Sequence, residues 1–101
     1  MHANVTSSEG RVVIRLEGRF DFSAHREFRE AVDAALKETG GRELVVDLGN
    51  VEYLDSSALG MLLMLRDRAR GAGRVVSLAN GRGAVKQVLE IANFNKLFTI
   101  V

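Results

Sequence analysis

Three adjacent residues, Asp55, Ser56 and Ser57, carry side chains that can cap a helix or accept a phosphate. They follow an apolar stretch and precede a segment with helical spacing, so we expect them at the N-terminus of a helix. A hydroxyl there can carry a phosphate at little cost, because free N–H groups and the helix dipole both favour an anion. Phosphorylation would add roughly −1.5 to −2 charges and would disturb any partner bound over that helix end. The structural alternative is that Asp55 or Ser56 only caps the helix, which stabilises it by about 1 kcal/mol.

The helix predicted from this point has apolar residues on more than one side. At about 100° per residue, one arc of the helix is wide enough to face a sheet. That arc contains Ala58, Leu59, Leu62, Leu65 and Ala69. Leu63 and Met64 lie outside it, on the side that carries Gly60 and Ser56. If exposed, they form an apolar patch suited to a partner; if neighbouring helices cover them, they are ordinary core residues.

A second candidate site is the predicted loop around Asp21, which follows a strand and precedes a helix. In a mostly parallel sheet, this loop and the Ser56 loop can emerge at the carboxyl ends of the strands, where such folds bind ligands. Asp21 would then share one composite surface with Asp55 and Ser56, and Phe20 and Phe22 are candidates for contact with a partner. The alternative is that Asp21 only caps the helix that follows it.

Basic residues are concentrated between residues 66 and 86, where Asp67 is the only acidic residue. The cluster consists of Arg66, Arg68, Arg70, Arg74, Arg82 and Lys86. Such a run is usually a solvated face, although it can also meet an acidic partner.

Strands and helices predicted from the apolar spacing alternate along the chain and position these loops. The predicted strands are residues 4–7, 12–16, 43–48, 74–78 and 97–101. The predicted helices run from Ser23 to a stop at Gly40 and Gly41, from Asp55 or Ser56 to about Arg70, and over residues 83–92. This order favours right-handed crossovers and a parallel sheet. We therefore expect one α/β domain over residues 1–101, with a mostly parallel four- to five-stranded sheet and about three to four helices packed against it.

The composition excludes several classes of protein. The 101 residues include no cysteine, which excludes disulfide scaffolds, cysteine metal sites and cysteine nucleophiles. The net charge of +1 argues against a generic nucleic-acid or membrane-surface binder. No apolar run approaches the ~20 residues that a bilayer requires, and the N-terminus lacks the signal-peptide pattern. A cytoplasmic location is the expectation.

Nothing in the sequence compels catalysis. A serine nucleophile needs a base and an oxyanion site, but His25 is the only credible histidine and there is no Gly-x-Ser-x-Gly elbow. The acidic residues are scattered, so we expect neither a metal nor a cofactor. The glycines of residues 80–83 lack the fuller nucleotide-binding fingerprint.

Taken together, these motifs resemble the STAS domains of bacterial anti-sigma factor antagonists over nearly the whole chain. The matching segments are residues 18–21 (GRFD), 45–48 (VVDL), 51–60 (VEYLDSSALG) and 70–73 (RGAG). In combination they are considerably more specific than the serine motif alone.

The resemblance implies a mechanism. In that family, the serine directly after the motif aspartate is phosphorylated by a partner serine kinase that often doubles as the anti-sigma factor. That position is Ser56 here, with Ser57 as the alternative. The unphosphorylated domain binds the kinase or anti-sigma factor, phosphorylation releases it, and a metal-dependent serine phosphatase restores the complex. Asp21 and Asp55 match family aspartates near the modified serine, whereas Ala58 replaces the usual glycine and adds a methyl group nearby.

We therefore predict a non-enzymatic, phosphorylation-controlled partner switch, with a monomer as the simplest state and with ATP bound by the kinase. Two other classes stay open. One is a constitutive STAS adaptor in which Ser56 only caps the helix. The other is a small-ligand or nucleotide-binding STAS module that uses the same helix end for an anion.

Overall fold

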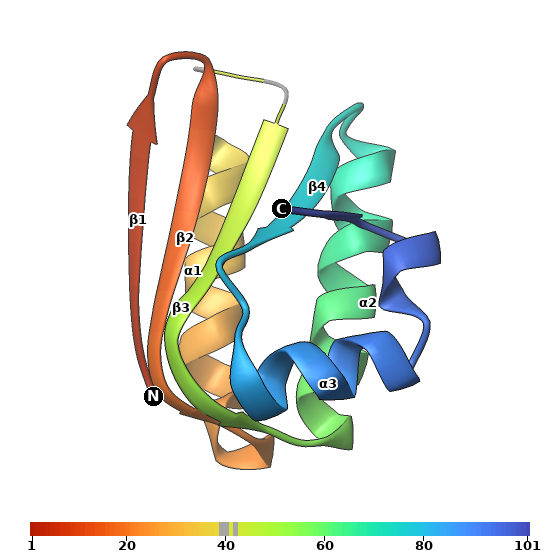
Figure 1. The fold of residues 1–101 in the computed structure, drawn as a ribbon. Helices are drawn as coiled ribbons and strands as arrows, with labels where there is room; N and C mark the ends of the chain where they lie inside the picture. Colours follow the sequence, from red (N-terminus) through yellow and green to blue (C-terminus); the bar gives the residue numbers. More distant parts are fainter. Residues whose placement is uncertain (39–40, 42) are drawn as a thin grey trace.

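A five-stranded sheet forms the centre of the computed structural model, which describes residues 1–38, 41 and 43–101 (Figure 1). The strands lie in chain order: β1 (His2–Ser8), β2 (Arg11–Phe20), β3 (Glu43–Leu54), β4 (Val75–Ala79) and β5 (Thr99–Ile100). β1 pairs antiparallel with β2, and the other neighbours pair parallel. The predicted α/β fold with a mostly parallel sheet is confirmed.

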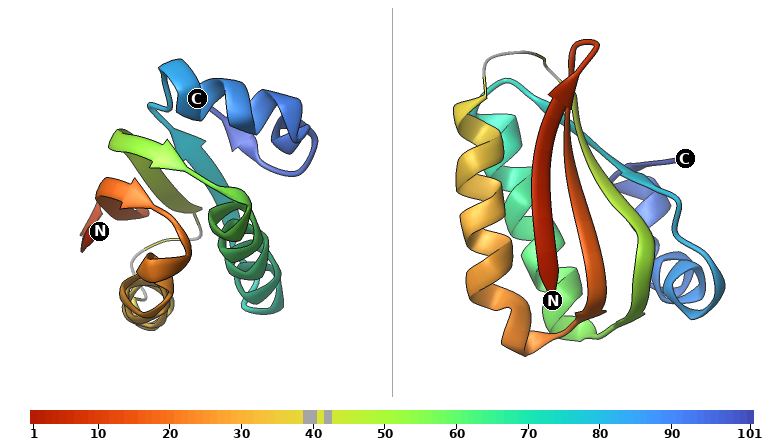
Figure 2. Two further views of the ribbon diagram at one scale, coloured as in Figure 1. Left: turned by 90° about the horizontal axis from the view of Figure 1, so that it is seen from below. Right: turned by 90° about the vertical axis from the view of Figure 1, so that its left-hand side faces the viewer.

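Within the described residues, three α-helices and two short 3-10 helices connect the strands. They are α1 (His25–Lys37), α2 (Ser56–Gly71) and α3 (Gly83–Ile91), with η1 (Phe22–Ala24) and η2 (Phe94–Lys96). Figure 2 shows α1 and α2 on one side of the sheet and α3 on the other. The helix predicted from Ser23 instead begins with η1 and continues as α1 from His25. Of the two glycines predicted to stop it, Gly40 lies outside the described residues.

Alternation along β2 builds the core between the sheet and α1. Val12, Ile14, Leu16 and Phe20 of β2 are all completely buried, because every second side chain of a strand points to the same face. The ring of Phe20 packs against the ring of Phe28 on α1 with their centroids 5.0 Å apart. Burying a phenylalanine stabilises the fold by roughly 1.5–3 kcal/mol, so this contact anchors the end of β2 to the helix.

β3 is longer than the sequence predicts. The loop expected to begin after residue 48 is wrong, because β3 continues to Leu54. Between the pair Arg15–Asp47 and the pair Phe20–Leu54, β2 advances five residues while β3 advances seven, through two register shifts. β-Bulges of this kind absorb extra residues without ending the strand. As a result β2 and β3 end side by side.

The buried face of α2 is close to the predicted arc. Ala58, Leu62, Leu65 and Ala69 are buried, as expected. Met61 is buried as well, whereas Leu59 is only half-buried. The set of buried residues on α2 therefore differs from the predicted arc at two positions, Leu59 and Met61, and the helix packs on the sheet as predicted.

No helix within the described ranges is both long and apolar enough to cross a bilayer. The same part of the chain also contains no group of three or more His, Asp or Glu side chains placed to hold a metal ion.

Candidate functional site

A backbone hydrogen bond joins the two loops that the sequence singles out. The N–H of Asp55, after β3, donates to the carbonyl oxygen of Phe20, the last residue of β2, at 3.3 Å. Figure 1 shows both loops at the lower edge of the sheet, where η1 and α2 begin. The prediction that the two loops emerge at one edge is therefore confirmed.

Asp55 is the residue that caps α2. Its carboxylate accepts a hydrogen bond from the N–H of Ala58 at 2.9 Å, and its carbonyl accepts the first helical bond, from Leu59, at 3.2 Å. An aspartate in this position satisfies one of the free N–H groups of the first turn and is worth about 1 kcal/mol. Of the two residues that the sequence offers as a cap, the structure therefore assigns this role to Asp55.

Ser56 is the first residue of α2, and its side chain is free of the capping role. Both Ser56 and Ser57 are exposed. Ala58, in contrast, is completely buried in the core. Its methyl group therefore faces the interior and does not share the exposed surface of Ser56. Gly60, one turn further along, is exposed, and a β-carbon there would meet nothing within 4 Å beyond its own helix.

Asp21 is held by its own loop. One carboxylate oxygen accepts hydrogen bonds from the hydroxyl of Ser23 at 2.5 Å and from the N–H of Ser23 at 3.0 Å. The other oxygen lies 3.6 Å from Nε of Arg19. The hydroxyl bond from Ser23 is the largest effect and lowers the pKa of Asp21 below its ordinary value, although desolvation opposes the shift. Asp21 is therefore charged at neutral pH and caps η1.

The η1 turn that Asp21 caps packs against α2. Among the described residues, however, no hydrogen bond links Asp21 directly to Asp55 or Ser56. The two carboxylates thus lie on adjoining elements, and each is engaged by its own cap.

Two residues that the sequence analysis did not select complete this edge. Arg19 and Tyr53 are register partners on β2 and β3, and the Arg19 guanidinium carbon lies 4.3 Å from the centroid of the tyrosine ring. Because Arg19 also pairs with Asp21, it connects the tyrosine to the η1 loop. Tyr53 is 41% exposed. Its outward position was hidden by the interpretation of this segment as a loop.

The two phenylalanines predicted to contact a partner occupy opposite environments. Phe22 is 74% exposed, so its side chain is available to a partner. Phe20 is completely buried against Phe28, and the prediction that its side chain contacts a partner is wrong. The sequence carried a signal for this, because Phe20 lies an even number of positions from Leu16 and so shares its inward face.

Leu63 and Met64 are both half-buried. Leu63 packs against the core from the side of α2. The apolar patch predicted from these two residues is therefore partly covered, and their contact with a partner stays a prediction.

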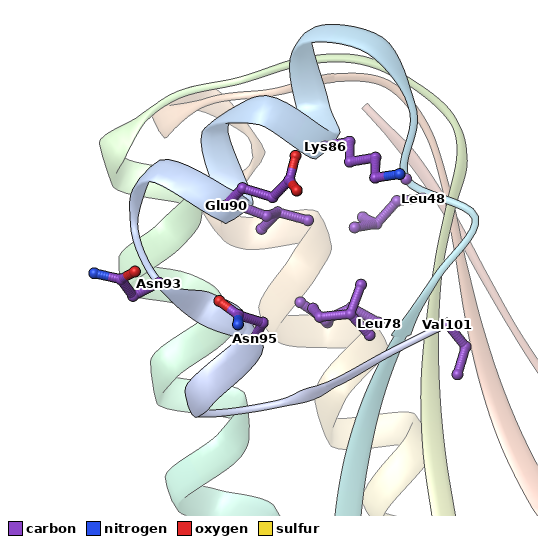
Figure 3. Close-up of a pocket in the computed structure, with 10 residues that line it drawn as sticks. Leu48, Leu78, Lys86, Glu90, Asn93, Asn95 and Val101 are labelled. Atoms are coloured by element: carbon purple, nitrogen blue, oxygen red, sulfur yellow. The ribbon is translucent and has the colours of Figure 1, made fainter.

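A separate cavity of about 580 Å³ lies between α3, η2 and the end of the sheet (Figure 3). Leu48 and Leu78 lie inside it, and Lys86 and Glu90 line it from α3. Its lining includes neither Ser56 nor any other residue of the α2 N-terminus. The cavity therefore offers no support for a ligand module built on that helix end.

Comparison with known proteins gives a consistent family assignment. A family model described as "Mlab, STAS domain" matches residues 3–101. A STAS-domain containing protein of Pseudomonas aeruginosa is 50% identical over 95 residues, which cover 93% of this chain and 92% of that protein. An anti-sigma F factor antagonist of Paenibacillus polymyxa is 24% identical over 91 residues, covering 90% and 78% of the two chains.

Solved structures share the fold at low sequence identity. An anti-sigma-factor antagonist (STAS) domain protein from Planctomyces limnophilus superposes with a TM-score of 0.85 at 19% identity, covering 99% of this chain and 89% of that one. The Bacillus cell fate determinant SpoIIAA in its phosphorylated form has a TM-score of 0.70 at 18% identity, with coverages of 98% and 90%.

Proposed function

The chain belongs to the STAS domain family, and on that premise we propose that it is an anti-sigma factor antagonist that acts as a partner switch controlled by phosphorylation of Ser56. The unphosphorylated form binds a serine kinase that also acts as an anti-sigma factor. Phosphorylation releases this partner, and a metal-dependent serine phosphatase restores the binding form. The chain itself is a non-enzymatic, monomeric, cytoplasmic regulator, and ATP belongs to the kinase.

The observation that carries this proposal is that Asp55 caps α2 while the neighbouring Ser56 is exposed and takes no part in the cap. Asp55 supplies the cap through its bond to Ala58, and Ser56 stands exposed in the first turn. A kinase can therefore modify Ser56 without removing the cap. The positive end of the helix dipole also favours a phosphate in this position.

The surroundings of Ser56 explain how a phosphate would release a partner. The new charge, roughly −2 at most, would appear beside the Asp55 carboxylate and at the same edge as the exposed Phe22 and Tyr53. A partner that covers these aromatic side chains would have to desolvate the phosphate, which is costly unless it offers a cation. The fold stays the same while the surface changes, which is the behaviour expected of a switch.

The comparisons support the proposal through the shared fold. One structural neighbour with this fold was solved in a phosphorylated form, so the fold can carry such a modification. Ser57 is the alternative acceptor, because it is also exposed. Asp21 and Asp55 frame the site, and Ala58 supports the first turn from the core. Phe22, Gly60, Leu63 and Met64 are proposed contacts of the partner.

A labelling experiment tests the proposal. The purified chain is incubated with a serine kinase of the proposed anti-sigma factor class from the same cells and Mg-ATP, in parallel with Ser56→Ala and Ser57→Ala. Label on the wild type and on Ser57→Ala, but not on Ser56→Ala, is the expected result. If the label persists on Ser56→Ala and disappears from Ser57→Ala, the phosphorylated residue is Ser57. Binding of the kinase without any label would make the chain a constitutive adaptor and would overturn the switch.

A further inference from the structure

A basic groove lies at the end of α2 opposite to Ser56. It has a volume of about 400 Å³ and runs between the last turns of α2 and the start of β4 and β5. Its cations are Arg66, Arg70, Arg74 and Lys96, and Val75 and Leu97 contribute apolar surface. No Asp or Glu belongs to this lining within the described chain. We refer to it below as the basic groove.

Two of the four cations are fixed in place by carbonyl oxygens. Arg66 donates from Nε to the carbonyl of Leu97 at 2.9 Å, which ties α2 to the segment before β5. Arg74 donates to the carbonyl of Ala35 at 3.0 Å and to that of Glu38. Neither guanidinium group pairs with a carboxylate of a described residue, and these bonds restrain both side chains. The carbonyls that hold Arg74 lie at the end of α1, outside the groove lining.

The other two cations are available to a ligand. Arg70 and Lys96 are exposed, and neither makes a side-chain hydrogen bond or ion pair with any other described residue. Arg68, in contrast, is on the same helix but pairs with Asp33 at 2.8 Å, outside the groove lining. The groove therefore combines two cations that hydrogen-bond to backbone carbonyls with two exposed cations that make no such bond among the described residues.

The helix dipole alone does not account for this arrangement. A cation in the last turn of α2, such as Arg70, is favoured by the negative end of the dipole. Lys96, however, comes from η2, and Arg74 comes from the segment between α2 and β4. Cations that converge from three segments repel one another in the free protein, and an anion that binds between them relieves this repulsion.

We propose that the basic groove is a second docking site, which takes an acidic segment of a protein partner. The apolar surface of Val75 and Leu97, which are 61% and 39% exposed, suits the side chains of a polypeptide. Thr99 of the groove lining begins β5, the last strand in the sheet order, which pairs only with β4 among the described strands. An extended segment can add its own hydrogen bonds to such an edge.

A nucleic acid fits the same groove less well. Single-stranded nucleic acids are held by exposed aromatic side chains on which their bases stack. Phe98, the only aromatic residue in the described lining, is 5% exposed and stacks instead on Phe94, with ring centroids 5.3 Å apart. The overall charge of +1 also provides little of the long-range attraction that phosphate backbones require.

This site is independent of the proposed phosphorylation site. Along the 16 residues of α2, the two ends are separated by about 24 Å at 1.5 Å per residue. Figure 1 shows the two ends of α2 at opposite ends of the sheet. A partner on the basic groove can therefore bind without covering Ser56.

Binding of a fluorescein-labelled peptide tests the proposal. The probe is a short peptide of alternating glutamate and serine, and its glutamine counterpart is the neutral control. Fluorescence anisotropy is measured with the wild type, with the double variant Arg70→Glu/Lys96→Glu, and with the matched double variant Arg26→Glu/Arg29→Glu on the exposed side of α1. Both double variants change the net charge equally, and circular dichroism establishes that both remain folded.

We expect the acidic peptide to bind and the neutral peptide not to bind. The affinity for the acidic peptide should fall as the salt concentration rises. Arg70→Glu/Lys96→Glu should reduce this affinity by about tenfold or more, and Arg26→Glu/Arg29→Glu by less than about twofold. An equal loss of affinity in the two double variants would mean a general charge effect and would contradict the proposal that the basic groove is the binding site. If a single-stranded oligonucleotide of equal charge binds more tightly than the acidic peptide, the proposal of a protein partner is wrong. Ser56→Asp should leave peptide binding unchanged, so this test can fail independently of the phosphorylation assay.

Discussion

The backbone N–H of Asp55 donates a hydrogen bond to the carbonyl oxygen of Phe20, and this bond joins the two loops of the candidate site directly. Both partners are main-chain atoms, so the contact does not depend on which side chains the loops carry. Phe20 adds a second constraint, because its buried ring fixes the end of β2 against α1. The exposed residues of the two loops are thus held in position by a main-chain hydrogen bond and by the buried ring of Phe20.

Replacing the cap of α2 should destabilise the protein, whereas replacing the exposed serine beside it should not. Asp55→Ala removes the bond to the Ala58 N–H and should lower the free energy of unfolding by about 1 kcal/mol. Ser56→Ala should change it by less than about 0.5 kcal/mol, as for other surface substitutions. Urea unfolding of the two variants measures both values. Equal losses would mean that Ser56 shares the capping role.

Replacing Phe20 should destabilise the protein far more than replacing Phe22. Phe20→Ala leaves a cavity against Phe28 and should cost about 3–5 kcal/mol. Phe22→Ala removes a ring that is 74% exposed and should cost no more than about 0.5 kcal/mol. Thermal and urea unfolding measure the two losses. A large loss for Phe22→Ala would show that this ring also supports the fold.

The stability contributed by Asp21 should depend on pH. The hydrogen bond from the Ser23 hydroxyl is the main cause that lowers the folded pKa of Asp21 from its ordinary value of 3.8. The folded state therefore binds fewer protons than the unfolded state between the lowered value and 3.8, so this contribution grows as the pH rises through that window. It is complete above the ordinary value and is lost as the pH falls through the folded value.

Two measurements check this behaviour of Asp21. In an NMR titration of the carboxyl carbon, Ser23→Ala should raise the pKa of Asp21 towards 3.8, because the largest favourable interaction is gone. In unfolding experiments, the advantage of the wild type over Asp21→Asn should shrink on acidification below the ordinary value. An unchanged pKa in Ser23→Ala would contradict the assignment of the cause.

Arg19 and Tyr53 should show a favourable coupling. The guanidinium group stacks over the ring at 4.3 Å, and an exposed cation–π contact is worth about 0.5–1 kcal/mol. A double-mutant cycle with Arg19→Met and Tyr53→Leu isolates this energy from the ion pair that Arg19 makes with Asp21. A coupling near zero would show that the stacked geometry contributes nothing in solution.

The charge at position 56 should decide partner binding. Ser56→Asp places a carboxylate in the exposed first turn of α2 and should weaken binding of the kinase, because the partner must desolvate it. Ser56→Ala should bind as the wild type does. Calorimetry with the purified kinase compares the two variants, and equal affinities would count against the switch. Ser57→Asp is a matched control for the position of the charge.

Regular patterns account for the parts of the fold that the sequence predicted correctly. The alternation of Val12, Ile14 and Leu16 fits a half-buried strand, and the helical spacing of α2 fits a sheet-facing arc. These patterns also place Ser56 and Asp21 at element ends, because caps and strand ends have local signals.

The errors arise where two strands interact over a distance. Gly49 and Asn50 carry a local turn signal, yet β3 continues through them, because its pairing with the long β2 strand stabilises the bulges. The predicted strand of residues 12–16 stops short of Phe20, whereas β2 continues to it, and this hid the inward position of Phe20 in the same way. The contact of Arg19 with Tyr53 depends on this register, which no local pattern encodes.

The exposed aromatic residues Phe22 and Tyr53 lie in η1 and near the end of β3, at an edge where main-chain hydrogen bonding joins the two segments. When a gene of this kind is duplicated, these two positions can change with little effect on the shared scaffold. Each copy can then acquire its own partner preference, and parallel pathways in one cell can be insulated from cross-talk. The architecture thus permits divergence of paralogues at this edge of the sheet without changes in the core.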